Sequence, residues 1–271
     1  MKKWIALLLT LAMIIGISGA FAGNDSWTCP NCGREDNNGS FCPDCGTKRP
    51  EEEPTQKREA ATETDIHTGD YVFFGKYEQS RNGNLSKIRW LVIDENNGNL
   101  FLLSELGLAR HRFNQSSNGA TWAECELRHW LNETLLKNAF NRDEREMILT
   151  TEVDDGPEQT NYTWDTAGRT GDITNDKIFL LSYEEMNSLV DPYDRLCEPS
   201  AAVRAMGVYT EKYNGKTCCW YWLRTSAYRN NAGVVDTNGN FDTCYIHHDY
   251  GVVRPALWVE ASAVTKDDGS R

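Results

Sequence analysis

Four cysteines near the start of the chain have the spacing of a metal site. Residues 29–32 read Cys-Pro-Asn-Cys and residues 42–45 read Cys-Pro-Asp-Cys, and a glycine follows each motif. Each Cys-x-x-Cys turn can direct two thiolates at one ion, so four thiolates would close a tetrahedral zinc site with a structural or protein-interaction role. Two disulfides are the alternative, since exported cysteines often oxidise. We favour a small zinc ribbon over residues 23–47, with zinc bound by Cys29, Cys32, Cys42 and Cys45.

Five further cysteines follow, at positions 125, 197, 218, 219 and 244. Their odd number leaves at least one thiol unpaired if the first four bind zinc. A copper-thiolate centre would need two of these five within reach of one metal. Buried thiols or a single disulfide is the simpler interpretation, and we favour it.

A polar and aromatic segment near the C-terminus is the best candidate for ligand binding. Residues 225–251 are rich in Asn, Asp, Gly, Tyr and His. Flat rings beside short hydrogen-bonding groups suit adaptable recognition. Adjacent side chains of a strand point to opposite faces, so the neighbouring histidines do not predict a metal site. The predicted ligand-binding residues are Tyr228, Asn230, Asn231, Asn240, Asp242, Tyr245, His247, His248 and Asp249.

Two apolar stretches, residues 218–224 and 252–259, flank this segment. A strand with large apolar side chains on both faces must be covered on both, so we expect the two stretches to be neighbouring central strands of one sheet. The polar segment should then project outward from that sheet. Sugar stacking by the tryptophans and anion recognition by the arginine at 254 are the functional alternatives. Because an unpaired buried charge is costly, we favour a structural role for Trp220, Trp222, Arg224 and Arg254.

The rest of the main domain alternates between strand and helix patterns that would position these stretches. Asn-Gly pairs at 97–98 and 238–239 each predict a hairpin turn. Thr121 and Glu124 have the form of a capping box at the start of a helix. Residues 151–176 form a long polar stretch that is a candidate binding loop. The expected strands lie at 70–77, 87–94, 100–104 and 177–182, and the expected helices at 121–137, 141–148, 182–190 and 199–206.

The N-terminus has the form of an export signal. Lys2 and Lys3 precede an apolar run, and an Ala-x-Ala sequence ends at Ala22, which predicts a cleaved signal peptide over residues 1–22. An uncleaved anchor is the alternative. Either form predicts a secreted or cell-surface protein, and no second apolar run is long enough to span a bilayer.

Charge excludes some classes of partner. Removing two lysines leaves 26 Lys and Arg against 40 Asp and Glu, so the mature chain carries a net charge of −14. This acidity argues against a nucleic-acid partner, which needs a basic surface. Residues 48–65 are highly charged and contain no aromatic residue, which predicts a flexible linker before a main domain at 66–262 and a tail at 263–271.

Several motifs of the main domain resemble an uncharacterised family of exported bacterial domains, whose members often carry a signal peptide and a zinc ribbon. The resemblance covers roughly residues 66–260. The chain departs from the usual pattern at 225–227, where it has Thr-Ser-Ala in place of Ser-Pro-Gly, and at Val252, where a glycine is usual. The motifs are Trp-Leu-Arg at 222–224, Val-Arg-Pro-Ala-Leu at 253–257, Asp-Lys-Ile-Phe-Leu-Leu-Ser at 176–182 and Thr-Trp-x-x-Cys-x-Leu-Arg-x-Trp-Leu-Asn at 121–132.

An aromatic strand, a polar hairpin and a terminal Gly-aliphatic-Arg strand also resemble the C-type-lectin-like fold. Formylglycine-generating enzymes and the variable proteins of diversity-generating retroelements share that arrangement. The resemblance implies an α+β domain, a C-type-lectin-like twisted antiparallel sheet with two packed helices. The catalytic motif of the formylglycine-generating enzymes does not match, so the resemblance assigns no catalytic residue.

These observations together predict an exported, non-enzymatic module that binds a carbohydrate or protein ligand and carries a structural zinc ribbon. An oxidoreductase of the formylglycine-generating type and a diversified surface display protein are the alternatives.

Overall fold

The computed structural model describes residues 28–35, 37, 39–48, 65–117, 120–155, 173–227 and 230–269. The chain divides into two compact units, residues 1–59 and 60–271, and each is described by itself. Several expected features lie outside the described residues: the signal peptide, the start of the ribbon at 23–27, nearly all of the linker, Tyr228, and the centre of the polar stretch at 156–172.

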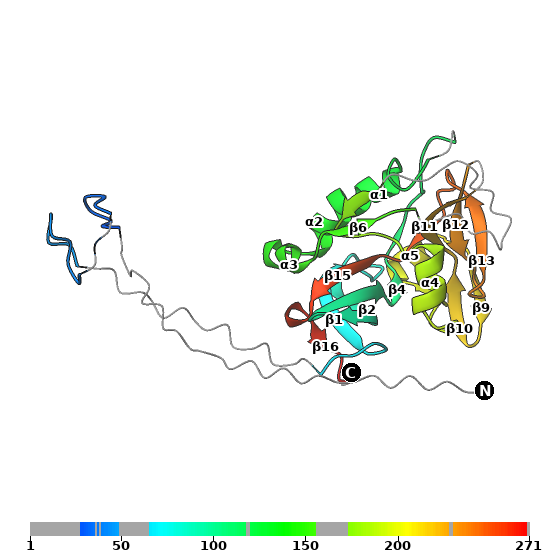
Figure 1. The fold of residues 1–271 in the computed structure, drawn as a ribbon. Coiled ribbons are helices and arrows are strands. Elements are labelled where there is room, and N and C mark those ends of the chain that lie inside the picture. Colours follow the sequence, from blue (N-terminus) through cyan, green and yellow to red (C-terminus); the bar gives the residue numbers. More distant parts are fainter. Residues whose placement is uncertain are drawn as a thin grey trace, which may run out of the picture. The chain divides into compact units, whose positions relative to one another are not determined.

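The second unit contains two five-stranded sheets (Figure 1). The first has the order β15-β3-β2-β1-β16 and is antiparallel throughout. The predicted three-stranded meander is confirmed, and Asn97 and Gly98 join β2 to β3 with φ angles of 51° and 78°. Two consecutive positive φ angles define the hairpin turn that Asn-Gly favours. The strands are β1 (Tyr71–Glu78), β2 (Leu85–Asn96), β3 (Asn99–Ser104), β15 (Ala256–Glu260) and β16 (Thr265–Lys266).

The second sheet has the order β13-β12-β11-β14-β5 and includes the predicted hairpin around Gly239. The two apolar stretches do meet here, because Tyr221 of β11 pairs with Val252 of β14. The strands are β5 (Ala109–Arg110), β11 (Tyr221–Ala227), β12 (Asn231–Val235), β13 (Phe241–Tyr245) and β14 (Val252–Val253).

Neither apolar stretch is a single strand, which corrects the prediction. Residues 252–259 break at Pro255, and the chain passes there from β14 in the second sheet to β15 in the first. Proline has no N–H to donate to a ladder, so it suits the crossing point. Residues 218–224 break at Trp220, between β10 (Lys216–Cys219) and β11. β10 pairs with β9 (Thr210–Tyr213) in a separate hairpin that the sequence interpretation missed.

Two small ribbons were not predicted, and the first lies within residues 151–182. The ends of the expected surface loop pair with each other as β6 (Thr151–Val153) and β7 (Thr174–Asp176). Residues 177–182 are not a strand, although Phe179 exchanges backbone hydrogen bonds with Ala256. The second ribbon joins β4 (Leu106–Gly107) to β8 (Glu198–Pro199) in parallel.

The first helical segment begins at Glu126, later than predicted. Cys125 is the N-cap residue and its sulfur accepts from the N–H of Arg128, while residues 121–124 form a turn. Capping boxes at Asn141 and Ser182 start two further helices, as expected. The helices are α1 (Glu126–Trp130), a π-helical turn (Leu131–Leu135), α2 (Leu136–Ala139), α3 (Arg142–Met147), α4 (Tyr183–Leu189), α5 (Ala201–Ala205) and a 3₁₀ turn (Ala261–Ala263).

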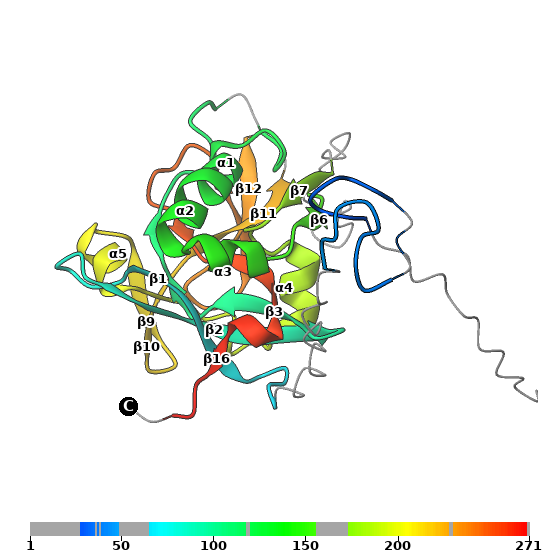
Figure 2. The same ribbon diagram turned by 90° about the vertical axis from the view of Figure 1, so that its left-hand side faces the viewer.

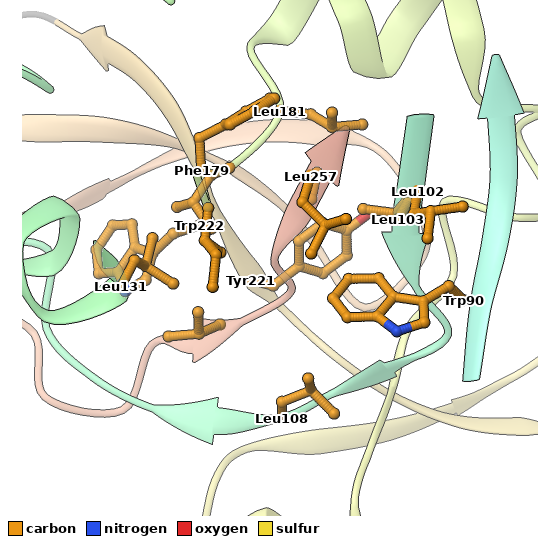
Figure 3. Packing of buried hydrophobic residues seen from close by; sticks show 14 of the residues in the cluster. Trp90, Leu102, Leu103, Leu108, Leu131, Phe179, Leu181, Tyr221, Trp222 and Leu257 are labelled. Carbon is orange, nitrogen blue, oxygen red and sulfur yellow. The ribbon is translucent and has the colours of Figure 1, made fainter. Parts of the chain in front are cut away.

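One hydrophobic core joins the two sheets and the first three helices. Figure 3 shows Tyr221 and Leu257 in the middle of this core, with Trp90 on one side and Trp222 and Leu131 on the other. Helices α1 to α3 follow one another along one side of the unit (Figure 2). The ends of the unit meet, since β16 pairs with β1. The fold is therefore α+β, with more strand than helix.

None of the helices in the described part of the chain is long and apolar enough to cross a membrane.

Candidate functional site

The four cysteines of the first unit form a compact cluster. Their sulfur atoms all lie within 4.8 Å of one another. The separations are 3.5 Å for Cys29–Cys45, 3.6 Å for Cys32–Cys42 and 3.4 Å for Cys32–Cys45. A tetrahedral Zn–S₄ site with bonds of about 2.3 Å has sulfur–sulfur edges of about 3.8 Å, whereas a disulfide bond is about 2.05 Å long. The cluster has the dimensions of a metal site, and its four sulfur atoms could hold one ion.

Two equivalent turns build this cluster. The N–H of Gly33 donates to the carbonyl of Cys29, and the N–H of Gly46 donates to the carbonyl of Cys42, at 2.9 and 2.8 Å. Both glycines have positive φ, 72° and 71°, a conformation that other residues adopt only with strain. Hydrogen bonds from the hydroxyl and backbone of Thr47 lower the pKa of the Cys45 thiol to about 6. The Cys-Pro-x-Cys-Gly repeat thus encodes a repeated local geometry.

The predicted ligand-binding residues divide between the two ends of the β12–β13 hairpin. Asn240 and Asp242 lie at the turn, where Asn240 donates to the carboxylate of Asp236. Tyr245 lies at the other end, paired with Asn231, whose buried Oδ1 has no hydrogen-bond partner among the residues that the structure describes. The hairpin length therefore separates residues that the sequence interpretation grouped together.

The exposed residues at the end of β13 and directly after it form a cluster of rings. Tyr245 is 56 % exposed, and its ring centroid lies 5.7 Å from that of His247 and 6.2 Å from that of His248. The two histidine rings stack on each other at 5.5 Å. Ile246, fully buried, anchors this segment, because its N–H donates to Asn230 and its carbonyl accepts from Asn114. Exposed rings are thus carried on a fixed backbone.

Arg110 contacts the residues that directly follow this cluster, and it was not predicted. Its guanidinium donates to the backbone carbonyl and carboxylate of Asp249, lies 4.8 Å from the centroid of the Tyr250 ring and donates to the carbonyl of Met206. Met206 and Tyr250 are 54 % and 49 % exposed. Arg110 is distant in sequence, so no local pattern could have placed it here. We call this set the 245–250 face: Arg110, Met206, Tyr245, His247, His248, Asp249 and Tyr250.

The tryptophans assigned as structural differ in burial. Trp222 is fully buried, and its indole N–H donates to the carbonyl of His111 at 2.9 Å. Trp220 is half-buried and meets the Trp222 ring edge to face at 5.0 Å. A Cβ atom on Gly251 would lie 1.8 Å from the indole nitrogen of Trp222, so only glycine fits there. Glycine is therefore sterically required at position 251 in this chain.

Arg224 and Arg254 are both 4 % exposed, and each lines a cavity. Arg224 donates to both carboxylate oxygens of Glu185, with 2.9 Å between Nη2 and Oε1, and to the carbonyls of Asp154 and Leu180. Arg254 donates to the carbonyls of Ser104 and Asp194, each at 2.8 Å, and to the Tyr221 hydroxyl at 3.2 Å. Neither cavity is lined by a predicted ligand-binding residue.

Two buried carboxylates near β6 and β7 were not predicted. Asp176 accepts from Arg128, Trp122 and Thr174, so its charge is paired. Asp155 accepts from the N–H of Trp122 and the hydroxyl of Ser226. Burial raises the pKa of Asp155 to about 6. Both serve to fix the ends of the 151–176 stretch.

The remaining cysteines are free thiols. Cys218 and Cys219 are consecutive in β10, so their side chains point to opposite faces. Cys219 lies opposite Cys197 in an isolated bridge and donates its N–H to the Cys197 carbonyl at 2.8 Å. Burial raises the pKa of the Cys219 thiol, which favours the protonated, unreactive form.

Comparison with known families decides what this chain is related to. A model of a domain of unknown function, DUF6273, matches residues 97–261. The chain belongs to this DUF6273 family. The expected membership of a family of unknown function is thereby confirmed over that span, which includes the 245–250 face, Arg224 and Arg254. No curated protein and no solved structure matches the chain.

Proposed function

We propose that this DUF6273 protein is an exported, non-enzymatic module that binds a ligand outside the cell through its 245–250 face. The observation that carries the proposal is the row of exposed rings at Tyr245, His247 and His248, held by the buried Ile246. Side chains on a fixed backbone lose little freedom on binding, so each contact contributes more to affinity. Tyrosine is favoured in binding surfaces because it offers a large area with few rotatable bonds.

The composition of the face supports a protein ligand over a carbohydrate. Met206, Arg110 and Tyr250 belong to the residue types that are enriched in protein interfaces. Neither of the two cavities that Arg224 and Arg254 line includes residues of the face. The net charge of −12 for the whole chain further supports a partner other than a nucleic acid.

A capture experiment with matched variants tests this proposal. The full chain is used to capture cell-surface proteins, and in parallel it is applied to a glycan array. We expect a reproducible protein ligand whose capture falls at least about tenfold with Tyr245→Ala or Tyr250→Ala, since interface aromatics are common hot spots. Tyr213→Ala, an exposed tyrosine on β9, is the control and should bind normally. Capture that ignores both face variants, or array binding alone, contradicts the proposal.

We also propose that the four-cysteine cluster holds zinc in a structural role. Four thiolates leave no open coordination position, and so small a unit has too few apolar residues to fold without a metal. Elemental analysis of the full chain should find about one zinc per molecule, with loss of the metal in Cys32→Ser and retention in Cys244→Ser. A metal-free protein whose intact mass shows two disulfides would contradict this assignment.

The proposed location and fold are separately testable. Export predicts that the secreted or surface-bound protein begins at Gly23, which N-terminal sequencing checks.

We further propose kinship with the C-type-lectin-like fold, supported by the paired terminal strands β1 and β16 and by the hairpin that precedes Arg254. An experimental structure that superposes on no member of that fold would contradict the kinship.

A further inference from the structure

A small polar cavity lies where the chain passes from the second sheet to the first. Its volume is about 60 Å³. A cavity needs only about 10–15 Å³ to admit one water molecule, so this one admits a group of a few heavy atoms and not a sugar ring. The lining residues are Tyr71, Glu105, Leu106, Asp194, Leu196, Glu198, Lys216 and Arg254.

Arg254 lines this cavity without a direct ion pair to any residue that the structure describes. Its hydrogen bonds run from Nε and Nη1 to carbonyl oxygens and to the Tyr221 hydroxyl, and none of them uses Nη2. Within the described ranges no carboxylate oxygen pairs with this guanidinium. A buried arginine without a counter-ion is unusual, because buried charges are normally paired. The unused Nη2 can donate to one carboxylate group.

The other charged groups of the cavity are mixed in sign. Lys216 lies over the Tyr193 ring at 4.1 Å, and it forms no ion pair with any residue that the structure describes. The backbone carbonyl of Asp194 accepts a hydrogen bond from Arg254, and the Asp194 carboxylate takes no part in that contact. Burial raises the pKa of the Tyr71 phenol, and the charges of Asp194 and Glu105 raise it further.

The remaining acidic residues are already engaged. Glu105 accepts from Arg89, whose guanidinium also stacks on Tyr71 at 3.6 Å. Glu198 accepts from the backbone N–H of Thr217. The carboxylates here do not form a metal-binding group: among described residues, the cysteine cluster is the one set with metal-site geometry. Asp194 is therefore the carboxylate that remains for a ligand.

This pattern disfavours both simple anions and simple cations. An anion would meet Arg254 and Lys216 but would be repelled by Asp194, Glu105 and Glu198, and a cation would be repelled by the two bases. At separations near 4 Å such repulsion is substantial even at the effective dielectric of a protein surface. A group that carries both charges on adjacent atoms satisfies both sides.

We propose that this cavity binds the main-chain end of a free α-amino acid. The carboxylate lies against Nη2 of Arg254 and the ammonium of Lys216, and the α-ammonium lies against the carboxylate of Asp194. The five heavy atoms common to all α-amino acids suit the volume, and a side chain would extend through the open side of the cavity.

Calorimetric titration of the full chain tests this proposal with three small probes. Glycine should bind, whereas acetate and methylammonium, which each carry one of its two charges, should bind at least about tenfold more weakly. Absence of glycine binding at millimolar concentration overturns the proposal. Acetate binding as tight as that of glycine also overturns it, because the cavity would then be a plain anion site.

Two rim variants locate the binding. Asp194→Asn keeps the carbonyl that holds Arg254, and Lys216→Gln changes a side chain that is half-exposed. Each should weaken glycine binding at least about tenfold while the unfolding temperature stays near that of the wild type. Asp143→Asn and Lys212→Gln, exposed residues on α3 and β9, repeat the charge changes elsewhere and should bind normally. Unchanged affinity in both rim variants overturns the assignment.

The test of glycine binding is independent of the test of the proposed function. Tyr245→Ala alters the 245–250 face and should leave glycine binding unchanged, and Asp194→Asn should leave capture of the protein ligand unchanged. A failure of either proposal is therefore visible without the other.

Discussion

Arg224 and Arg254 have the same burial and lie in the Trp-Leu-Arg and Val-Arg-Pro-Ala-Leu motifs, yet the protein accommodates them in different ways. Around Arg224 the charge is neutralised by Glu185, and the remaining donors reach backbone carbonyls. Around Arg254, carbonyl oxygens and one hydroxyl accept the hydrogen bonds, and the charge itself is left without a counter-ion in the described structure. The difference indicates that the first arginine stabilises the fold and that the second is also available to a ligand.

The surroundings of the two arginines follow the same division. Near Arg224, ionic and capping contacts such as that of Asp176 with Arg128 fix the segments. Near Arg254, close packing fixes them: a Cβ on Gly107 would lie 2.3 Å from Val252, and a Cβ on Gly251 would overlap Trp222. Charge substitutions should therefore have their largest effect on the contacts near Arg224. Volume changes should have their largest effect at the close contacts of Gly107 and Gly251.

The largest effect is expected from Gly251→Ala. The added methyl group overlaps the buried indole of Trp222, which also donates to His111, so neither side can yield easily. We expect the free energy of unfolding to fall by about 3 kcal/mol, at the upper end of overpacking effects. Urea unfolding measures it.

A second substitution separates the clash from other causes. Combining Gly251→Ala with Trp222→Phe relieves the overlap, because the smaller ring leaves room for the methyl group. The loss in free energy of unfolding of the double variant should therefore be smaller, by more than about 1 kcal/mol, than the sum of the two single losses. Strict additivity would show that the close approach of Gly251 to the ring is not what fixes the Arg254 region.

Glu185→Gln should have the next largest effect. Glutamine at this position can still complete the capping box with Ser182, but the guanidinium of Arg224 is left buried without its carboxylate. We expect a loss of about 2 to 3 kcal/mol in the free energy of unfolding, measured by urea titration. Glu126→Gln, at an exposed acid in the first turn of α1, is the matched control and should change stability by less than about 0.5 kcal/mol. Equal losses would refute the importance of the ion pair.

Asp155→Asn should stabilise the protein in a pH-dependent way. The pKa of this carboxyl is about 6 in the folded protein against an ordinary value of 3.8, so the folded state binds the proton more tightly than the unfolded state. Stability is therefore lost as pH rises from about 4 to about 6 and is constant above. Asparagine resembles the protonated acid, so the variant should be more stable than wild type by about 3 kcal/mol at pH 7 and equal to it near pH 4.

Thermal unfolding of both proteins across this pH range checks the prediction. Asp143→Asn, an exposed acid on α3, should show no such dependence. A difference between Asp155→Asn and wild type that is the same at pH 4 and pH 7 would mean that the carboxyl titrates normally.

Local chemistry determined which features could be predicted from the sequence. The turn at Asn97-Gly98, the helix starts at Asn141 and Ser182 and the four-cysteine cluster each depend on residues within a few positions, and all were predicted. The crossing at Pro255 was missed because apolar alternation looks the same when one strand continues and when two strands of different sheets follow each other.

The candidate sites were harder to predict, since their residues come from distant segments. Arg110 reaches Asp249 across 139 positions, and Arg254 reaches Ser104 across 150. A single sequence carries no signal of such pairs. The polar composition of the C-terminal segment did indicate exposed rings, but the register of β12 and β13 decides which of them lie together.

Tyr221→Phe should have the smallest effect of the series and tests the Arg254 side of the comparison directly. The Tyr221 hydroxyl donates to the Arg195 carbonyl at 2.7 Å and accepts from Arg254 at 3.2 Å. Several neutral acceptors together stabilise the charge of Arg254 in this interpretation. Removing one of them should then lower the free energy of unfolding by about 1 kcal/mol, the usual contribution of a single hydrogen bond. Tyr193→Phe, an exposed tyrosine, is the control and should unfold like wild type in urea. A loss as large as that of Glu185→Gln would instead mean that this hydroxyl alone supports the charge, and the contrast between a paired and a distributed arginine would no longer hold.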